Sequence, residues 1–376
     1  MDLHIVSFEI PYPADFGGVF DIFHKIRKLY EKGIRIHLHC FQKKREAQKE
    51  LEKYCISVNY YTRNTGHKGI STSLPYIVSS RVSKELEENL LKDNFPILLE
   101  GIHCTYLLDS GKLKGRKVVV RLHNVEYDYY QQLAGQTPSL PRKVLHRWES
   151  YLLKKYERSI AQSDALLLGI TEKDCITYRR EFGAKNIAFL PAFIPWDSPI
   201  NEEGIGTFCL YHGNLSVPEN ENVAIWLLEK IFNKLEIPFV IAGKDPSPHL
   251  QRLAHTQKHT CIVANPSSTE MQDLISKAQV LILPSFTNTG IKYKLLTSVF
   301  SGRHCVINDK MEEGSALGPA CHIANSKDAF ASVITQLYRK PYDNHEIQIR
   351  RQLLHETYNN EITVNRLIQW IFEHYQ

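Results

Sequence analysis

The chain has 376 residues, of which 43% are hydrophobic and 23% charged, and its formal net charge is +5. This length exceeds what one hydrophobic core usually supports, so we expect two domains. The ordinary composition argues against a disordered or fibrous protein, and no apolar run approaches the roughly 18 residues of a membrane span. The first residues lack the basic start of a signal peptide and predict a strand instead.

Cysteine spacing and charge clusters narrow the class of protein further. The eight cysteines are spread singly without a C-x-x-C pair, which favours reduced thiols in a cytoplasmic protein over a zinc or disulfide framework. Basic residues gather in segments 25–49 and 142–158. Solvated helix faces are the simplest interpretation, and contact with anionic lipid headgroups or a phosphorylated acceptor is the functional alternative. Nucleic acid is not expected, because no nucleic-acid-binding motif accompanies the charge.

In the first half of the chain, strand-like runs alternate with helix-like patterns. Strands are predicted at 3–8, 34–41, 57–61, 96–102, 117–123, 165–170 and 187–193, and helices at 19–32, 141–162 and 172–182. We expect Thr171 to cap the last of these helices and Gly183 to end it. Residues 191–206 carry three prolines and two glycines and are predicted to link two domains.

The alternation restarts in the second half. Strands are predicted at 207–212, 238–242, 261–264, 280–284 and 304–308, and helices at 220–235, 249–256, 269–278 and 290–301. The interior strands are continuous apolar runs, typical of a parallel sheet covered by helices on both faces. The pattern predicts an α/β protein with two doubly wound, Rossmann-like domains, 1–195 and 196–358, that bind ligands at the carboxyl ends of their strands, facing an interdomain cleft.

A glycine pair and a polar segment are the candidate sites in the first half. Gly17 and Gly18 lie between the first strand and the first helix, where backbone amides can approach an anion. A plain tight turn explains them equally well, because the spacing is not G-x-G-x-x-G. His123, Asn124 and Glu126 come at or after the end of a strand, which places them at the carboxyl edge of the sheet. A hydrogen-bonded structural histidine is the simpler alternative for His123.

Three further positions follow the same rule. Glu100 and His103 lie at the end of the strand predicted at 96–102, and Gly213 follows the first strand of the second half. Gly213 allows a ligand to approach the backbone, and a helix-capping turn at 218–220 is the structural alternative. Both interpretations stay open, because one turn can serve both purposes.

The segment 283–302 is the most specific signal in the chain. A strand ends at Pro284–Ser285, and a glycine turn leads into a predicted helix. Thr289 or Asn288 is expected to cap this helix and to expose the amides of Gly290 and Ile291 to a diphosphate. Lys292 adds positive charge near that end of the helix.

These motifs together resemble GT-B glycosyltransferases of the large retaining group that includes bacterial surface-polysaccharide enzymes. The resemblance implies that the first domain binds the acceptor and the second the nucleotide-sugar, while the last helix, in 359–376, crosses back to the first domain. It implies catalytic roles for His123 and Glu126 and acceptor contacts for Asn124 and His103. The donor-binding residues expected from it are Gly17, Gly18, Gly213, Asn214, Lys244, Ser285, Thr289, Gly290, Ile291, Lys292, Lys294 and Thr297.

The family's Glu-x7-Glu signature falls on Thr289 and Thr297, so the spacing is kept but both carboxylates are replaced. A hydroxyl makes a neutral contact where a carboxylate accepts charge-assisted bonds, a difference of about 1–2 kcal/mol per site. The expected activity is the retaining transfer of a hexose from a nucleoside diphosphate sugar to an acceptor hydroxyl, with no metal because no D-x-D motif is present in a suitable loop. The acceptor is expected to be a carbohydrate or lipid-linked.

Two alternatives remain at this stage. A GT-B-like protein that binds but does not catalyse is supported by the loss of both glutamates. A GT-B epimerase is disfavoured, because the second domain offers few acidic and histidine groups for chemistry at the sugar C2. The protein is expected in the cytoplasm, with possible peripheral contact at the inner face of an anionic membrane.

Overall fold

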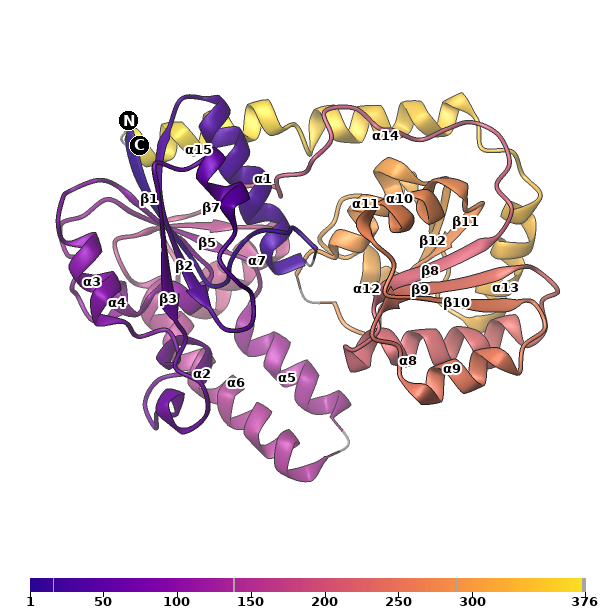
Figure 1. The fold of residues 1–376 in the computed structure, drawn as a ribbon, viewed down its shortest axis with the longest axis horizontal. Helices are drawn as coiled ribbons and strands as arrows, with labels where there is room; N and C mark the ends of the chain where they lie inside the picture. Colours follow the sequence, from indigo (N-terminus) through magenta and orange to yellow (C-terminus); the bar gives the residue numbers. More distant parts are fainter. Residues whose placement is uncertain (16, 138, 289, 374–376) are drawn as a thin grey trace. The chain divides into compact units, whose positions relative to one another are not determined.

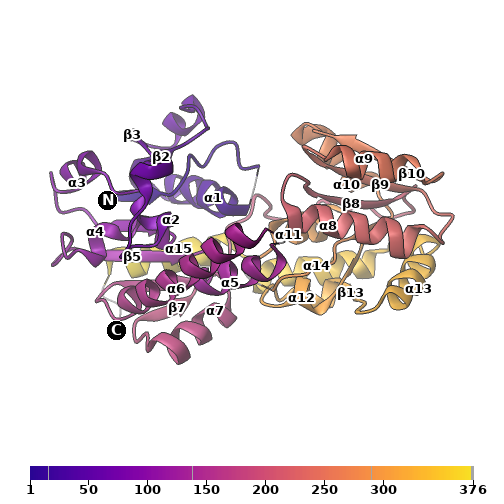
Figure 2. The ribbon, with the colours of Figure 1, turned by 90° about the horizontal axis from the view of Figure 1, so that it is seen from below.

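A computed structural model describes residues 1–15, 17–137, 139–288 and 290–373 (Figures 1 and 2). The described chain divides into two compact units. The first unit comprises Met1–Pro195, residues 290–291 and the C-terminal stretch from Asn360, and the second comprises Trp196–Asn288 and Lys292–Asn359. Each unit has one parallel β-sheet, so the predicted α/β fold with two Rossmann-like domains is confirmed.

The first unit has a seven-stranded sheet of order β3-β2-β1-β4-β5-β6-β7. Chain order reverses between β1 and β4, the point where ligands bind in open α/β sheets. The central strands β4 and β5 are near-continuous apolar runs, as expected where helices cover both faces of a parallel sheet. Their bounds are β1 Asp2–Ser7, β2 Arg35–Gln42, β3 Ser57–Thr62, β4 Ile97–Glu100, β5 Val118–Leu122, β6 Leu166–Gly169 and β7 Ile187–Phe189.

The helix α7, Glu172–Thr177, begins, and the π-helical turn after it ends, where local chemistry predicts. The Thr171 side chain accepts a hydrogen bond of 3.0 Å from the Asp174 amide, and Gly183 adopts the left-handed φ of 71° that ends the helix after a π-helical turn. The helices are α1 Gly17–Glu31, α2 Tyr76–Ser79, α3 Lys84–Leu90, α4 Tyr106–Asp109, α5 Glu126–Gln136, α6 Leu140–Ala161, α7 Glu172–Thr177 and α15 Asn360–Phe372.

The C-terminal helix α15 packs against α1 in the first unit. Lys32 Nζ lies 2.6 Å from Glu361 Oε2, and three side chains of α15 join the core of this unit: Val364, Leu367 and Ile371. Burial of these three apolar side chains gives the attachment most of its stability, because the exposed ion pair is worth little.

Two carboxylates of α6 cap other helices of the first unit. Glu149 accepts from the amides of Tyr76 and Ile77 at 2.9 and 3.0 Å, and Glu157 accepts from the amides of Glu126 and Tyr127 at 2.8 and 2.9 Å. Amides at the start of a helix have no partner within it, so each carboxylate satisfies two of them and faces the positive end of the helix dipole. Glu157 thereby fixes the start of α5, where Glu126 lies.

The second unit has a six-stranded sheet of order β10-β9-β8-β11-β12-β13, with its reversal between β8 and β11. Its strands are β8 Cys209–Asn214, β9 Phe239–Lys244, β10 Thr260–Ala264, β11 Val280–Ile282, β12 His304–Ile307 and β13 His322–Ile323. Its helices are α8 Pro218–Leu227, α9 Pro248–His255, α10 Ser268–Lys277, α11 Tyr293–Ser301, α12 Asp309–Glu312, α13 Lys327–Tyr338 and α14 Asn344–Glu356.

All eight cysteines are free thiols. Among the helices that the structure describes, none combines the length and the apolar character required to cross a lipid bilayer.

Candidate active site

A buried network of charged side chains lies at the carboxyl edge of the first sheet. Glu100 ends β4, His123 follows β5, and Lys25 comes from α1. Lys25 Nζ lies 2.7 Å from Glu100 Oε1, and His123 Nε2 lies 2.9 Å from Glu100 Oε2. A carboxylate can only accept, so His123 donates from Nε2, which leaves Nδ1 as the acceptor on the other side of the ring. Glu100 therefore sets both the tautomer and the direction of His123.

Asp21 and Arg121 extend this network, because Asp21 also pairs with Lys25. The Arg121 guanidinium bonds both oxygens of Asp21 at 3.1 and 3.2 Å and the carbonyl of Leu190 at 2.5 Å. Burial pushes the pKa of Asp21 up, but Arg121 and Lys25 outweigh burial and hold this pKa well below its usual range. Opposite charges are therefore paired where water does not reach, and Arg121 acts by positioning its neighbours.

Glu126, the first residue of α5, is a buried carboxyl group with unusual acid strength. It is 4% exposed, and burial raises its pKa to about 7. Asn124 Nδ2 donates to Glu126 Oε1 over 3.4 Å, so the two predicted residues are adjacent. A carboxyl group that titrates near neutrality can both give and take a proton, as general acid–base chemistry requires.

His103, on the turn after β4, stacks on Phe8 with ring centroids 4.8 Å apart. Its Nδ1 makes no hydrogen bond within the described residues, although it is buried. Phe8 also meets the edge of His123 at 5.5 Å, and Arg81 donates to the Phe8 carbonyl at 3.0 Å. The structure thus places His103 and His123 on two sides of one ring, with a cation nearby.

The glycine pair belongs to the same region through its helix. Gly17 and Gly18 are the first two residues of α1, which also carries Asp21 and Lys25. The predicted loop-to-helix transition is therefore confirmed, two residues earlier than expected. Whether a ligand approaches it stays a prediction.

In the second unit, two glycines face each other at the carboxyl edge of the sheet. Gly213 of β8 pairs with Gly243 of β9, and a Cβ atom on Gly243 would lie 1.9 Å from the Gly213 carbonyl oxygen. Only glycine fits at position 243 without moving the backbone. Asn214 and Lys244, which end the two strands, are both exposed at this edge.

A carboxylate that the sequence did not single out lies in this unit. Glu219 is in the first turn of α8, and its Oε1 accepts from the hydroxyls of Ser285 and Thr287 at 2.9 and 2.6 Å. Lys292 Nζ in turn donates to Thr287 Oγ1 at 3.2 Å. Burial acts to raise the pKa of Glu219, but Lys292 and the two hydroxyls outweigh it, so the pKa is lowered. Both hydroxyl bonds go to Oε1, which leaves Oε2 as the atom for a ligand to reach.

Lys294 lies beside this group. Its Nζ donates to Asn220 Oδ1 at 2.9 Å and lies 5.0 Å from the centre of the Tyr211 ring. Burial lowers the pKa of Lys294 to about 8, although Glu219 acts in the opposite direction. An ammonium group in this state gains from an added anion, because the anion restores the charge balance that burial disfavours.

The segment 283–302 differs from its predicted local structure. The helix α11 begins at Tyr293 with Lys292 as its N-cap, so the expected start at Gly290 and the expected cap at Asn288 are wrong. Gly290 has a left-handed φ of 59°, which an α-helix cannot contain. Gly290 and Ile291 therefore precede the helix. Thr289 lies outside the described residues.

Thr297 lies on α11 as expected, but its hydroxyl proton forms a hydrogen bond within the same helix. Thr297 Oγ1 donates to the Tyr293 carbonyl at 3.1 Å, one turn earlier in the same helix. The oxygen keeps only neutral acceptor capacity toward a ligand. The charged acceptor in the described part of this cluster is Glu219.

Within the part of the chain that the structure describes, two groups of side chains have the composition of a metal site: Asp21, Glu100 and His123, and separately His304, His322 and Glu346. In the first group, the Lys25 ammonium lies within 2.9 Å of both carboxylates and occupies the position that a metal ion would need. In the second group, Lys340 and Arg350 already pair with Glu346 at 3.4 and 3.2 Å. We assign no metal to either group.

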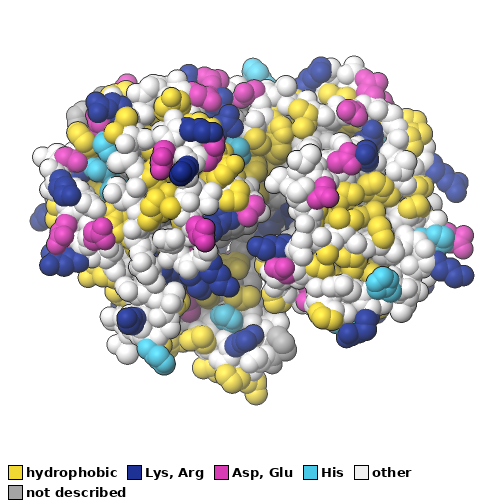
Figure 3. Space-filling view, in the orientation of Figure 1, with side chains coloured by type: hydrophobic (Ala, Val, Ile, Leu, Met, Phe, Trp, Pro, Cys, Tyr) yellow, Lys and Arg dark blue, Asp and Glu magenta, His cyan; other side chains and the backbone are white. Residues whose placement is uncertain are grey.

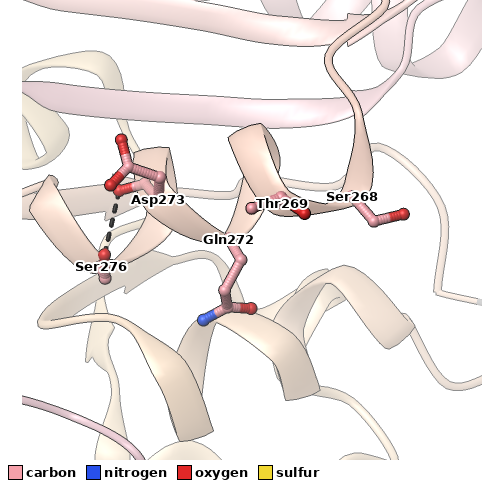
Figure 4. A pocket seen from close by; sticks show the side chains of 5 residues that line it. All are labelled: Ser268, Thr269, Gln272, Asp273 and Ser276. Carbon is pink, nitrogen blue, oxygen red and sulfur yellow. Dashed lines mark hydrogen bonds between the residues drawn. The ribbon is translucent and has the colours of Figure 1, made fainter.

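Figure 4 shows a shallow surface depression on α10, lined by Ser268, Thr269, Gln272, Asp273 and Ser276. Its lining residues all come from one helix, and Ser276 bonds the Asp273 carbonyl of that helix at 3.0 Å. It shares no residue with the cluster around Glu219, and nothing in it suggests chemistry.

Comparison with known proteins connects this arrangement to a family. Residues 206–340 match the family described as Glycosyl transferases group 1. The crystal structure of WaaG, a glycosyltransferase involved in lipopolysaccharide biosynthesis, matches over 100% of both chains with a TM-score of 0.67 and 11% identity. The Anabaena protein HepE, solved in complex with UDP and glucose, matches over 98% of both chains with a TM-score of 0.67 and 12% identity. The fold is GT-B.

One relative is similar over most of its sequence. The "Uncharacterized 44.6 kDa protein in cps region" of Klebsiella pneumoniae is 28% identical over 352 residues, 88% of this chain and 89% of the relative. Together with the group 1 match, the GT-B fold supports a glycosyltransferase.

Proposed function

We propose that the protein transfers a hexose from a nucleoside diphosphate sugar to a hydroxyl of a carbohydrate or lipid-linked acceptor, with retention, in surface-polysaccharide or glycoconjugate synthesis. The group 1 match, residues 206–340, covers most of the second unit, and HepE was solved with UDP and glucose. The Klebsiella relative's link to a cps region supports the polysaccharide context. We place the reaction in the cytoplasm, in keeping with eight free thiols.

The observation that carries this proposal is the cluster of Lys292, Lys294 and Glu219 in the second unit. Lys292 is linked to Glu219 through the Thr287 hydroxyl, with distances of 3.2 and 2.6 Å. Lys294 bonds Asn220, the residue next to Glu219 in α8, and both lysines lie at the start of α11. A departing diphosphate needs such fixed positive charge, and a helix N-terminus adds to it. We propose that these lysines, with the Gly213–Gly243 edge and the exposed charge of Lys244 next to it, replace a metal ion.

Glu219 provides the second requirement of a nucleotide-sugar site. Ribose and hexose present neighbouring hydroxyl donors, and an ionised carboxylate is their strongest neutral-pH acceptor. We propose that Glu219 Oε2 accepts donor hydroxyls and so supplies a charge that Thr297 lacks. The resemblance assigned this task to positions 289 and 297.

In the first unit we propose that His123 and Glu126 contact the transferred sugar and acceptor. Glu100 holds His123 at 2.9 Å in one tautomer, and Glu126 titrates near neutrality with a pKa of about 7. Asn124 and His103 are proposed to orient the acceptor hydroxyls, because both lie beside these two groups.

A binding protein without catalysis is the second candidate, and the local bond of the Thr297 hydroxyl favours it. A panel of UDP-, GDP-, TDP- and ADP-sugars in a thermal-shift assay identifies the donor, since a ligand that binds only the native state raises Tm. Turnover of that donor then separates the candidates. Release of nucleoside diphosphate supports transfer, and binding without release supports the second candidate. If no sugar nucleotide binds folded protein, both are wrong.

A further inference from the structure

The helix α6 exposes an unusual run of large hydrophobic side chains. Leu140 is 74% exposed, Val144 65%, Leu145 61%, Trp148 50% and Tyr151 63%. All five lie within twelve consecutive residues of one helix. Scattered exposed hydrophobics are ordinary on protein surfaces, but a contiguous group marks an interaction surface.

Helical spacing aligns most of these side chains. Leu140, Val144, Trp148 and Tyr151 follow one another at intervals of four, four and three residues, which places them along one face of α6. The Trp148 and Tyr151 rings lie 5.7 Å apart. Tryptophan and tyrosine combine an apolar ring with a polar group, a combination enriched at membrane–water interfaces.

The charges that α6 exposes at the surface are all of one sign. Its two acidic residues, Glu149 and Glu157, are buried and bonded to the starts of α2 and α5. Every exposed charge on α6 is therefore positive: Arg142, Arg147, Lys154, Lys155 and Arg158, with Lys143 half-buried. Lys154 Nζ lies 3.6 Å from the Glu181 carboxylate, and Arg158 donates to the Glu181 backbone carbonyl at 3.4 Å. The first half of α6 is therefore its more strongly cationic part.

The hairpin of α5 and α6 presents this surface away from the sheet of the first unit. The two helices pack side by side, and their joined ends project beyond the other elements of that unit (Figure 1). In Figure 3, hydrophobic and basic side chains gather together at the lower end of the first unit. The exposed stripe therefore has no partner within its own unit.

We propose that the first half of α6, Leu140–Tyr151, docks into the headgroup region of an anionic lipid bilayer. Apolar side chains enter the acyl boundary, while arginine and lysine meet lipid phosphates at the surface. A second copy of this chain is a poorer occupant, because a two-fold contact would bring two sets of positive charges together without acidic partners. The inference rests on α6 alone and does not depend on the proposed function.

Vesicle co-sedimentation tests it with the full-length protein. We expect at least tenfold stronger partitioning into vesicles of phosphatidylcholine with 30% phosphatidylglycerol than into phosphatidylcholine alone. The double variant Val144→Ser/Trp148→Ser should lose at least fivefold of the binding, and Arg142→Gln/Arg147→Gln should lose a similar part together with its salt dependence. Ile323→Ser, an exposed hydrophobic residue of the second unit, is the matched control and should bind like the wild type.

Two further measurements distinguish membrane docking from a folding defect and from self-association. Circular dichroism melting should be unchanged in every variant, because the substituted side chains are exposed. Sedimentation velocity reports the oligomeric state without lipid. Equal vesicle binding by Val144→Ser/Trp148→Ser and wild type overturns the proposal, as does a wild-type dimer that this variant abolishes.

Discussion

Replacing Glu219 by Gln removes one negative charge from the donor cluster and changes few atoms. The Gln oxygen can still accept from Ser285 and Thr287, so the local structure should persist. The Gln nitrogen, however, replaces the carboxylate oxygen that we assign to donor hydroxyls. A hydrogen bond to a charged group contributes about 1.5–3 kcal/mol, so the dissociation constant of the nucleotide-sugar should rise roughly 10- to 100-fold.

The sign of this effect distinguishes two roles for Glu219. If Glu219 only anchors Lys292 through Thr287, its neutralisation would leave Lys292 and Lys294 with more positive charge for a diphosphate. Binding would then tighten, because a like charge near the anion has been removed. A ligand-accepting role predicts weaker binding, and an anchoring role predicts equal or tighter binding.

Isothermal titration of the donor found by the thermal-shift panel measures this difference. Glu229→Gln, at an exposed carboxylate of the same unit paired with Lys230 at 3.5 Å, is the matched control and should bind like the wild type. Titration with nucleoside diphosphate alone shows whether the ribose or the hexose makes the contact. Unchanged or improved affinity of folded Glu219→Gln for the nucleotide-sugar refutes the assignment.

Three further predictions follow from the pKa shifts and the glycine edge. The pKa of Lys294 is about 8 in the ligand-free protein and a bound diphosphate raises it, so nucleotide affinity should fall as pH rises above about 8. Lys294→Met should lower the affinity roughly tenfold at pH 7 and remove this pH dependence. Lys234→Met, at an exposed lysine, should do neither in the same titration. Folding raises the pKa of Glu126 from 4.5 to about 7, so its contribution to stability is full below pH 4.5 and lost as pH rises to about 7, at a cost of up to about 3 kcal/mol. Denaturant titrations of Glu126→Gln should show a smaller decline than the wild type, because Glu157 and Asp174, whose pKa values burial also raises, remain. An identical decline would contradict burial of the Glu126 carboxylate. Gly243→Ala should lower the free energy of unfolding by about 1–3 kcal/mol through collision with the Gly213 carbonyl, whereas Gly135→Ala, with open space around it, should be neutral or stabilising in the same assay.

Periodicity predicted the fold well because parallel sheets impose long, regular apolar patterns. The predicted strands of both sheets, the cap at Thr171 and the left-handed Gly183 depend on residues within a few positions of each other. The edge strand β13, His322–Ile323, was not predicted, because two residues are too few to form an apolar pattern. The helix α5 was not predicted, because its start depends on Glu157, thirty-one residues away. The start of α11 was misplaced because nothing local indicated that Gly290 takes a left-handed φ.

The site was only partly predictable for the same reason. Strand-end reasoning placed His123, His103 and Glu126 at one edge. The structure brings the two histidines together around Phe8, and Glu126 accepts from Asn124, the residue after His123. Glu219 was missed, because its bonds to Ser285 and Thr287 span 66 and 68 residues. The signal that could have found it is an acidic residue in the first turn of a helix that directly follows a strand-end glycine. Arg81 follows no strand and offered no such signal.

Release of nucleoside diphosphate from the nucleotide-sugar panel decides whether the protein transfers glycosyl groups. We predict that folded wild-type protein releases diphosphate from at least one sugar nucleotide, and that Lys292→Met/Lys294→Met reduces the release at least tenfold while Lys234→Met does not. Equal release by wild type and the double variant would contradict the assigned role of the lysine cluster. The absence of both binding and release for every donor in the panel would contradict glycosyl transfer itself.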